Sequence, residues 1–104
     1  MDDAIRRAQA FEKAGAHVVY VPIPPSIAEL KRLCASVSCP VNALAAGPYL
    51  KHTLAEFAAA GVRRISLGSS IARLTHRVVN DAVAALTRDG DFSMLADSIS
   101  GAVV

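Results

Sequence analysis

AGAHVVYV at residues 14–21 and AGVRRISL at residues 60–67 are two copies of one kind of junction. In each copy a glycine ends a helical pattern, and a run rich in apolar residues follows at once. Short, nearly continuous apolar runs are typical of parallel strands that are buried on both faces. The repeated junction therefore predicts successive helix-to-strand units and an α/β fold.

Helical patterns lie on either side of these junctions. Apolar residues recur at helical spacing from Ala4 to Phe11, with Asp2 or Asp3 as the expected N-cap and Gly15 as the C-terminal stop. Two further helices are expected to begin at capping boxes, in which a hydroxyl and a glutamate each satisfy a free helix N–H. The two boxes are Ser26 with Glu29 and Thr53 with Glu56.

Three strands are expected, at residues 17–21, 40–45 and 64–67, and they start roughly two dozen residues apart. After the third strand, residues 68–70 should turn into the longest helix, which Gly90 ends. Residues 91–104 are expected to form one more short helix, with Phe92, Leu95 and Ile99 inward. The architecture predicted for residues 1–104 is a single α(βα)3 domain with three parallel strands and a long C-terminal helix.

Composition excludes several classes of protein. The 104 residues carry a formal net charge of only +2, with no cluster of basic residues among exposed aromatics, so a nucleic-acid partner is not expected. No apolar run is long enough to span a membrane, and no signal peptide is recognisable, so we expect a cytoplasmic protein without a membrane partner. Cys34 and Cys39 are expected to be reduced thiols that serve packing.

A three-stranded sheet has two outer strands, and each of them has one unpaired edge. Three strands cannot close a barrel, so both edges would stay open and invite pairing. The sequence therefore predicts a partner, and a homo-oligomer formed through the open sheet edges or through exchange of the last helix is the expected form.

Four stretches carry a resemblance to a known family: residues 3–8, 14–22, 39–42 and 61–68. In order and spacing they resemble the final three strands of the isocitrate lyase/phosphoenolpyruvate mutase superfamily. The resemblance implies that the chain is the C-terminal part of a (βα)8 barrel. It also implies a parent enzyme that makes or breaks C–C or P–C bonds in a small carboxylate or phosphonate substrate, with Mg²⁺ as cofactor.

Magnesium ligands and the general base lie on earlier strands in that family. All nine acidic residues of this chain fall on expected helices or near chain ends, and none follows a strand at the edge where barrel enzymes do their chemistry. We therefore expect no catalytic residue and no metal site in this chain, which should be inactive alone. A non-catalytic self-associating module and a small anion-binding α/β domain remain the alternatives.

Arg73 is the leading candidate for substrate binding. It lies in the first turn of the longest helix, after Gly68, Ser69 and Ser70, where free N–H groups and a guanidinium favour an anion. In the methylisocitrate lyase-like members, the resemblance places here an arginine that grips a substrate carboxylate. A surface arginine, with Ser69 or Ser70 as a simple N-cap, is the alternative.

Asn42 is the other candidate, because a polar side chain within a buried strand needs a partner. It either points toward substrate or bonds neighbouring backbone. Leu44 and Pro22 stand where many lyase members have an asparagine and a glutamate, which disfavours an isocitrate-type substrate.

The remaining polar residues are expected to be structural or solvated. Tyr49, Lys51 and His52 follow the second strand and either close over a ligand or, as we expect, lie in solvent. His17 is expected to be a satisfied structural histidine, and His76 is expected to titrate on a helix surface.

Overall fold

The computed structural model of the chain describes residues 1–103, with side chains through residue 102. It divides into two compact units, residues 1–68 and the part that begins at Ser69. The expected single domain over residues 1–104 stays a prediction. Each unit is described by itself.

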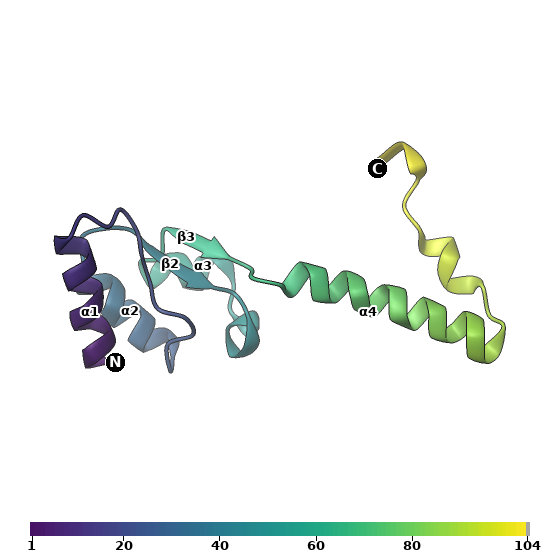
Figure 1. Cartoon of the computed structure of the whole chain (residues 1–104), viewed down its shortest axis with the longest axis horizontal. Helices are drawn as coiled ribbons and strands as arrows, with labels where there is room; N and C mark the ends of the chain where they lie inside the picture. The colour runs from purple at the N-terminus through teal and green to yellow at the C-terminus, as the bar shows by residue number, and fades with distance from the viewer. Residues whose placement is uncertain (104) are drawn as a thin grey trace. The chain divides into compact units, whose positions relative to one another are not determined.

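The first unit is a three-stranded parallel sheet with helices (Figure 1). Its elements follow in the order α1 (Asp2–Lys13), β1 (Val19–Tyr20), α2 (Ile27–Ala35), β2 (Val41–Leu44), the 3₁₀ turn η1 (Gly47–Lys51), α3 (Leu54–Ala59) and β3 (Arg64–Ser66). The strands lie in the order β1-β2-β3, and each neighbouring pair is parallel. The predicted α/β class and the three parallel strands are confirmed.

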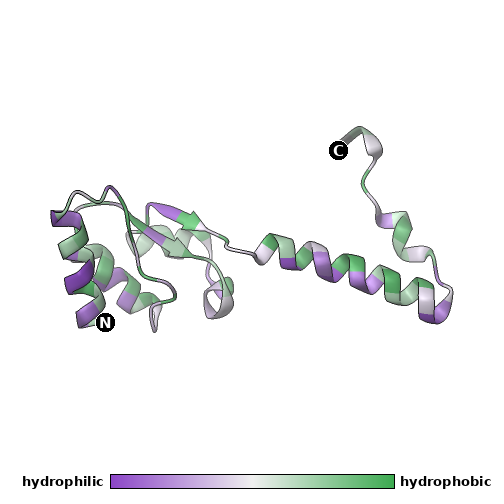
Figure 2. Cartoon of the chain, viewed as in Figure 1, coloured by the Kyte–Doolittle hydropathy of each residue, from purple (hydrophilic) through white to green (hydrophobic). Residues whose placement is uncertain are grey.

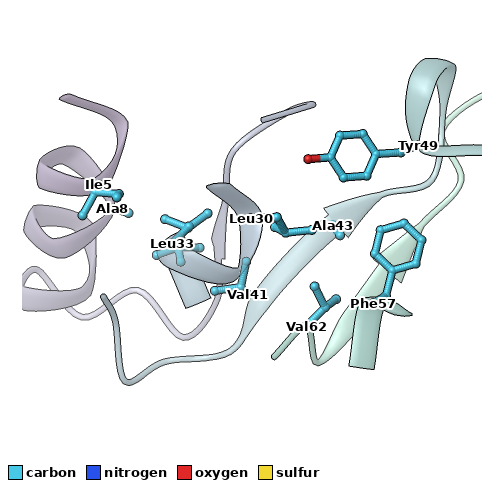
Figure 3. Packing of buried hydrophobic residues seen from close by; sticks show 10 residues of the cluster. Ile5, Ala8, Leu30, Leu33, Val41, Ala43, Tyr49, Phe57 and Val62 are labelled. Atoms are coloured by element: carbon cyan, nitrogen blue, oxygen red, sulfur yellow. The ribbon is translucent and has the colours of Figure 1, made fainter. Parts of the chain in front are cut away.

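The core lies between the helices and one face of the sheet. Leu30 and Leu33 of α2, Val41 of β2 and Phe57 of α3 are its largest fully buried side chains, and Figure 3 shows them together. Burying an aliphatic or aromatic side chain of this size contributes about 1.5–3 kcal/mol. Because successive side chains of a strand point to opposite faces, one face of β2 packs against α2 and α3.

The helix starts follow the expectation in part. Thr53 and Glu56 form a complete capping box, with the Thr53 backbone N–H donating to the Glu56 carboxylate over 2.7 Å. In the other box, Ser26 accepts from the Glu29 N–H, but the Glu29 carboxylate pairs with Arg32. The expected aspartate N-cap of α1 is wrong, because Met1 takes the N-cap position and the aspartates lie inside the first turn.

The first strand is shorter and more exposed than its sequence suggests. It was expected to be buried on both faces, yet Val18 is 40% and Tyr20 45% exposed. Within β1 (Val19–Tyr20) only Val19 belongs to the buried core, and Val21 packs against that core from just beyond the strand. Within the first unit, helices cover one face of the sheet, and Tyr20 lies on the other.

The second unit begins with α4 (Ser70–Ala84), which continues into the π-helical turn η2 (Ala85–Asp89) and ends at Gly90, where φ is +64°. Two short 3₁₀ turns follow, η3 (Ser93–Asp97) and η4 (Gly101–Val103). Figure 2 shows apolar and polar residues alternating around α4. None of its residues is buried, and the expected inward placement of Phe92, Leu95 and Ile99 is wrong, since all three are exposed. Among the described residues, no helix is both long and apolar enough to cross a membrane.

Candidate functional site

The loops that leave the carboxyl ends of β1 and β2 are fastened to one another by Tyr49. Its hydroxyl lies 3.0 Å from the carbonyl oxygen of Pro24 and 2.8 Å from that of Ser26. The ring is stacked on Phe57 and tilted against His52. Burial raises the pKa of the Tyr49 phenol. The expectation of a solvated tyrosine is wrong, because two carbonyl acceptors satisfy its hydroxyl inside the protein.

The same pair of loops contains a strained residue. Ile23 has φ +43°, in the left-handed region that β-branched residues avoid. Its side chain lies beside Gly47, where an added Cβ would meet Ile23 Cδ1 at 3.8 Å. The strained backbone therefore lies where the two loops meet.

Asn42 lies in the middle strand and is only 5% exposed. Its Nδ2 donates to Ser66 Oγ over 2.9 Å, and that hydroxyl lies 3.2 Å from the Ala43 carbonyl oxygen. The Oδ1 atom is buried and has no hydrogen-bond partner among the described residues. The amide thus reaches backbone only through Ser66, and a role in substrate binding stays a prediction. Ser66 was missed by sequence reasoning, although it is a polar residue within an expected strand.

Gly68, the last residue of the first unit, has φ +55°, and an added Cβ would lie 3.4 Å from Leu44 Cδ1. Ser69 then takes the N-cap position of α4, but its side chain makes no capping hydrogen bond. Its carbonyl oxygen accepts from the Arg73 backbone N–H over 2.8 Å. The structure therefore brings Ser69, Ser70 and Arg73 into the first turn of one helix, while Asn42 belongs to the other unit.

Arg73 is exposed, and its guanidinium makes no hydrogen bond or ion pair within the described part of the chain. Other arginines of the same region do, since Arg77 pairs with Asp81 and Arg88 with Asp89. A free guanidinium beside a helix N-terminus is available to an anion.

The acidic residues do not fit a magnesium site. The acidic residues of the first unit lie on α1, α2 and α3, and the rest lie on or after α4. Within residues 1–103, no three His, Cys, Asp or Glu side chains lie together as metal ligands would. We therefore assign no metal-dependent step to this chain.

The histidines and cysteines add no second site. His76 is exposed as expected, but His17 is exposed too, so its expected structural role is wrong. His52 Nδ1 lies 3.4 Å from the Glu56 carboxylate. Cys34 and Cys39 are free thiols, as expected, and burial raises the pKa of both.

Comparison with known proteins connects this geometry to a family. The sequence profile described as phosphoenolpyruvate phosphomutase matches residues 1–87. Two uncharacterized proteins of Mycobacterium tuberculosis, from strains H37Rv and CDC 1551 / Oshkosh, are each 40% identical to this chain over 65 residues. Those residues are 62% of this chain and 24% of each relative.

Two solved structures share the fold. A chain named as a lyase/mutase of Burkholderia cenocepacia J2315 is similar with a TM-score of 0.90 and 32% identity, over 98% of this chain and 37% of that one. A phosphoenolpyruvate phosphomutase of Streptomyces platensis subsp. rosaceus is similar in fold, with a TM-score of 0.76 and 24% identity, over 98% and 36%. The chain thus spans about a quarter of the curated relatives' length and just over a third of the solved chains.

Proposed function

The chain belongs to the phosphoenolpyruvate phosphomutase family, and we propose that it contributes a substrate-anion site to a barrel of that family while holding none of its catalytic groups. The anion is a carboxylate or phosphonate of a small substrate. The observation that carries the proposal is the first turn of α4, where the guanidinium of Arg73 and the hydroxyl of Ser69 are both unused by the described residues of their own unit.

Three kinds of donor favour an anion at this turn. The first N–H groups of a helix have no intrahelical acceptor, and the helix dipole is positive there. Ser69 and Ser70 add hydroxyl groups, and Arg73 adds a planar guanidinium that matches a carboxylate or phosphonate in a bidentate way. Gly68 precedes the turn with a left-handed φ, which shapes the approach to the helix. Asn42 of β2, in the first unit, is proposed separately as a polar contact to substrate.

Catalysis belongs to other strands in this proposal. Magnesium is the cofactor expected for the parent family, and its ligands and the general base would come from polypeptide outside this chain. The acidic side chains present here lie on helices and turns, and none of them belongs to a strand or follows one directly. The lone chain should therefore bind a substrate anion without converting it.

Calorimetric titration of the chain with phosphonopyruvate at low ionic strength tests the site. Arg73→Ala should weaken binding by about 10- to 100-fold, because a hydrogen bond to a charged group contributes about 1.5–3 kcal/mol. Arg77→Ala is the matched control, since Arg77 lies on the same helix and already pairs with Asp81. The control should stay within about twofold of wild type. Equal binding by wild type and Arg73→Ala would contradict the proposal.

We further propose that the chain self-associates through α4. Ile71, Leu74 and Val78 are all more than half exposed, although they share one helical stripe. Exposed apolar stripes of this kind mark interaction surfaces. Sedimentation equilibrium should give a homo-oligomer for wild type and a smaller species for Leu74→Glu, and a clean wild-type monomer at micromolar concentration argues against the idea.

A further inference from the structure

An open groove lies between α2 and α3 on the helix-covered side of the first unit. It is lined by Ile27, Ala28 and Lys31 of α2 and by Glu56, Ala59 and Ala60 of α3. Its lining is mostly apolar, and its volume is about 340 Å³. A cavity of roughly 150 Å³ already holds a benzene ring. The groove therefore has room for an aromatic and an aliphatic side chain together.

The groove carries one acidic and one basic residue, and only the basic one is unused. The Glu56 carboxylate accepts the Thr53 N–H over 2.7 Å and the Thr53 hydroxyl over 2.9 Å. Lys31 is exposed, and its ammonium makes no hydrogen bond or ion pair with the described residues. An occupant that complements this groove is therefore apolar and brings a carboxylate to Lys31.

The second unit contains a segment with this chemistry, residues 91–99. Phe92 and Leu95 are both at least half exposed. The Leu95 N–H donates to the Phe92 carbonyl oxygen over 3.0 Å, and residues three apart in such a 3₁₀ turn project from one side. Asp97 is exposed and makes no hydrogen bond or ion pair within the described chain. The segment holds no lysine, arginine or histidine, so its charge complements Lys31.

We propose that residues 91–99 of a second copy of this chain dock in the groove. Phe92 and Leu95 then lie between α2 and α3, and the Asp97 carboxylate faces Lys31. A second copy is the occupant because the segment closely follows α4, the helix through which the copies are proposed to associate. The docking rests on that proposed self-association and gives it a second surface, on the first unit. It does not involve the anion site at Arg73.

Photo-cross-linking between two kinds of copy tests the contact. One copy carries a photoreactive derivative of phenylalanine at position 92, and the other keeps Phe92 and is labelled uniformly with a heavy nitrogen isotope. Mass spectrometry should find the peptide of position 92 joined to labelled peptides that contain Ala28 or Ala59. Sedimentation equilibrium of the same mixture measures self-association separately.

Charge reversal at the groove tests the ion pair. Lys31→Glu in the labelled copy should lower the yield of the mixed cross-links about three- to tenfold, because an attraction becomes a repulsion. Asp97→Lys in the photoreactive copy should restore the yield. Lys13→Glu is the matched control, since Lys13 of α1 is exposed, has no partner among the described residues and does not line the groove. Circular dichroism should show that all variants keep the wild-type fold.

The outcomes separate this docking from the association through α4. An oligomer that gives no mixed cross-links at the groove overturns the docking and leaves the association through α4 in place. A monomer overturns both. Cross-links confined to peptides of a single copy would place the segment on its own chain and overturn the docking. A yield that Lys13→Glu lowers as much as Lys31→Glu does would overturn it too.

Discussion

The hydroxyl of Tyr49 lies 3.0 Å from the carbonyl oxygen of Pro24, and this bond joins two loops at the carboxyl edge of the sheet. The residues are 25 positions apart in the chain, and Tyr49 is only 3% exposed. Ser26 offers the same hydroxyl a second acceptor. The position of one loop therefore depends on a side chain of the other.

Tyr49→Phe should lower the free energy of unfolding by about 1 kcal/mol, because the ring stays but buried carbonyl groups lose their donor. Urea denaturation followed by circular dichroism measures the change. Tyr20→Phe is the control, since Tyr20 is 45% exposed and should lose little. A Tyr49→Phe protein as stable as Tyr20→Phe would show that the loops are held by ring packing alone.

The left-handed backbone at Ile23 should favour glycine at this position. At φ +43° a side chain is disfavoured by about 1–2 kcal/mol, so Ile23→Gly should be more stable than Ile23→Ala by about 1 kcal/mol. At Ala55, an exposed position within α3, glycine should instead be the less stable residue. If glycine were less stable than alanine at position 23, as it should be at position 55, strain at Ile23 would be ruled out.

Glu56 makes the capping box of α3 sensitive to acid. Its pKa is lowered by hydrogen bonds from the Thr53 backbone and then from the Thr53 hydroxyl, with a smaller effect of His52. A carboxyl whose folded pKa is depressed stabilises the protein above its unfolded pKa, about 4.3, and loses that stabilisation as the pH falls through the folded value. Stability should therefore fall on acidification more steeply for wild type than for Glu56→Gln, as thermal melts across this range would show. Parallel curves would indicate that the box does not ionise as described.

Truncation to alanine should cost much more stability at Leu33 than at Leu74. Leu33 is fully buried and packs in the core of the first unit, so Leu33→Ala should lose about 2–5 kcal/mol. Leu74 is 61% exposed on α4. Leu74→Ala should therefore change the free energy of unfolding of a monomeric sample by less than about 0.5 kcal/mol. A large loss for Leu74→Ala in dilute solution would mean that α4 is part of the folding core.

Sequence reasoning reached the fold because local signals agreed with one another. Gly15, Gly61 and Gly90 all take the positive φ that a helix stop requires, and the Thr53 capping box forms as expected. Tyr49 was misjudged because its acceptors, Pro24 and Ser26, are distant in sequence, and no local pattern announces such a bond. Tyr20 was misjudged because an apolar run shows that a strand is built for burial and says nothing about which element covers it.

The candidate site was predictable only in its helix. Helical periodicity placed Ser69, Ser70 and Arg73 in one turn, and the structure agrees. The Asn42 to Ser66 hydrogen bond depends on strand register, which a single sequence does not fix.

The central claim is that this chain holds a substrate anion but none of the catalytic groups. Turnover of phosphonopyruvate by the purified chain in the presence of Mg²⁺ tests it most directly, with a sample lacking the chain as the blank. The account predicts a rate equal to the blank. Turnover above the blank that a chelator abolishes would contradict it, because a metal site and catalytic groups would then lie within these 104 residues.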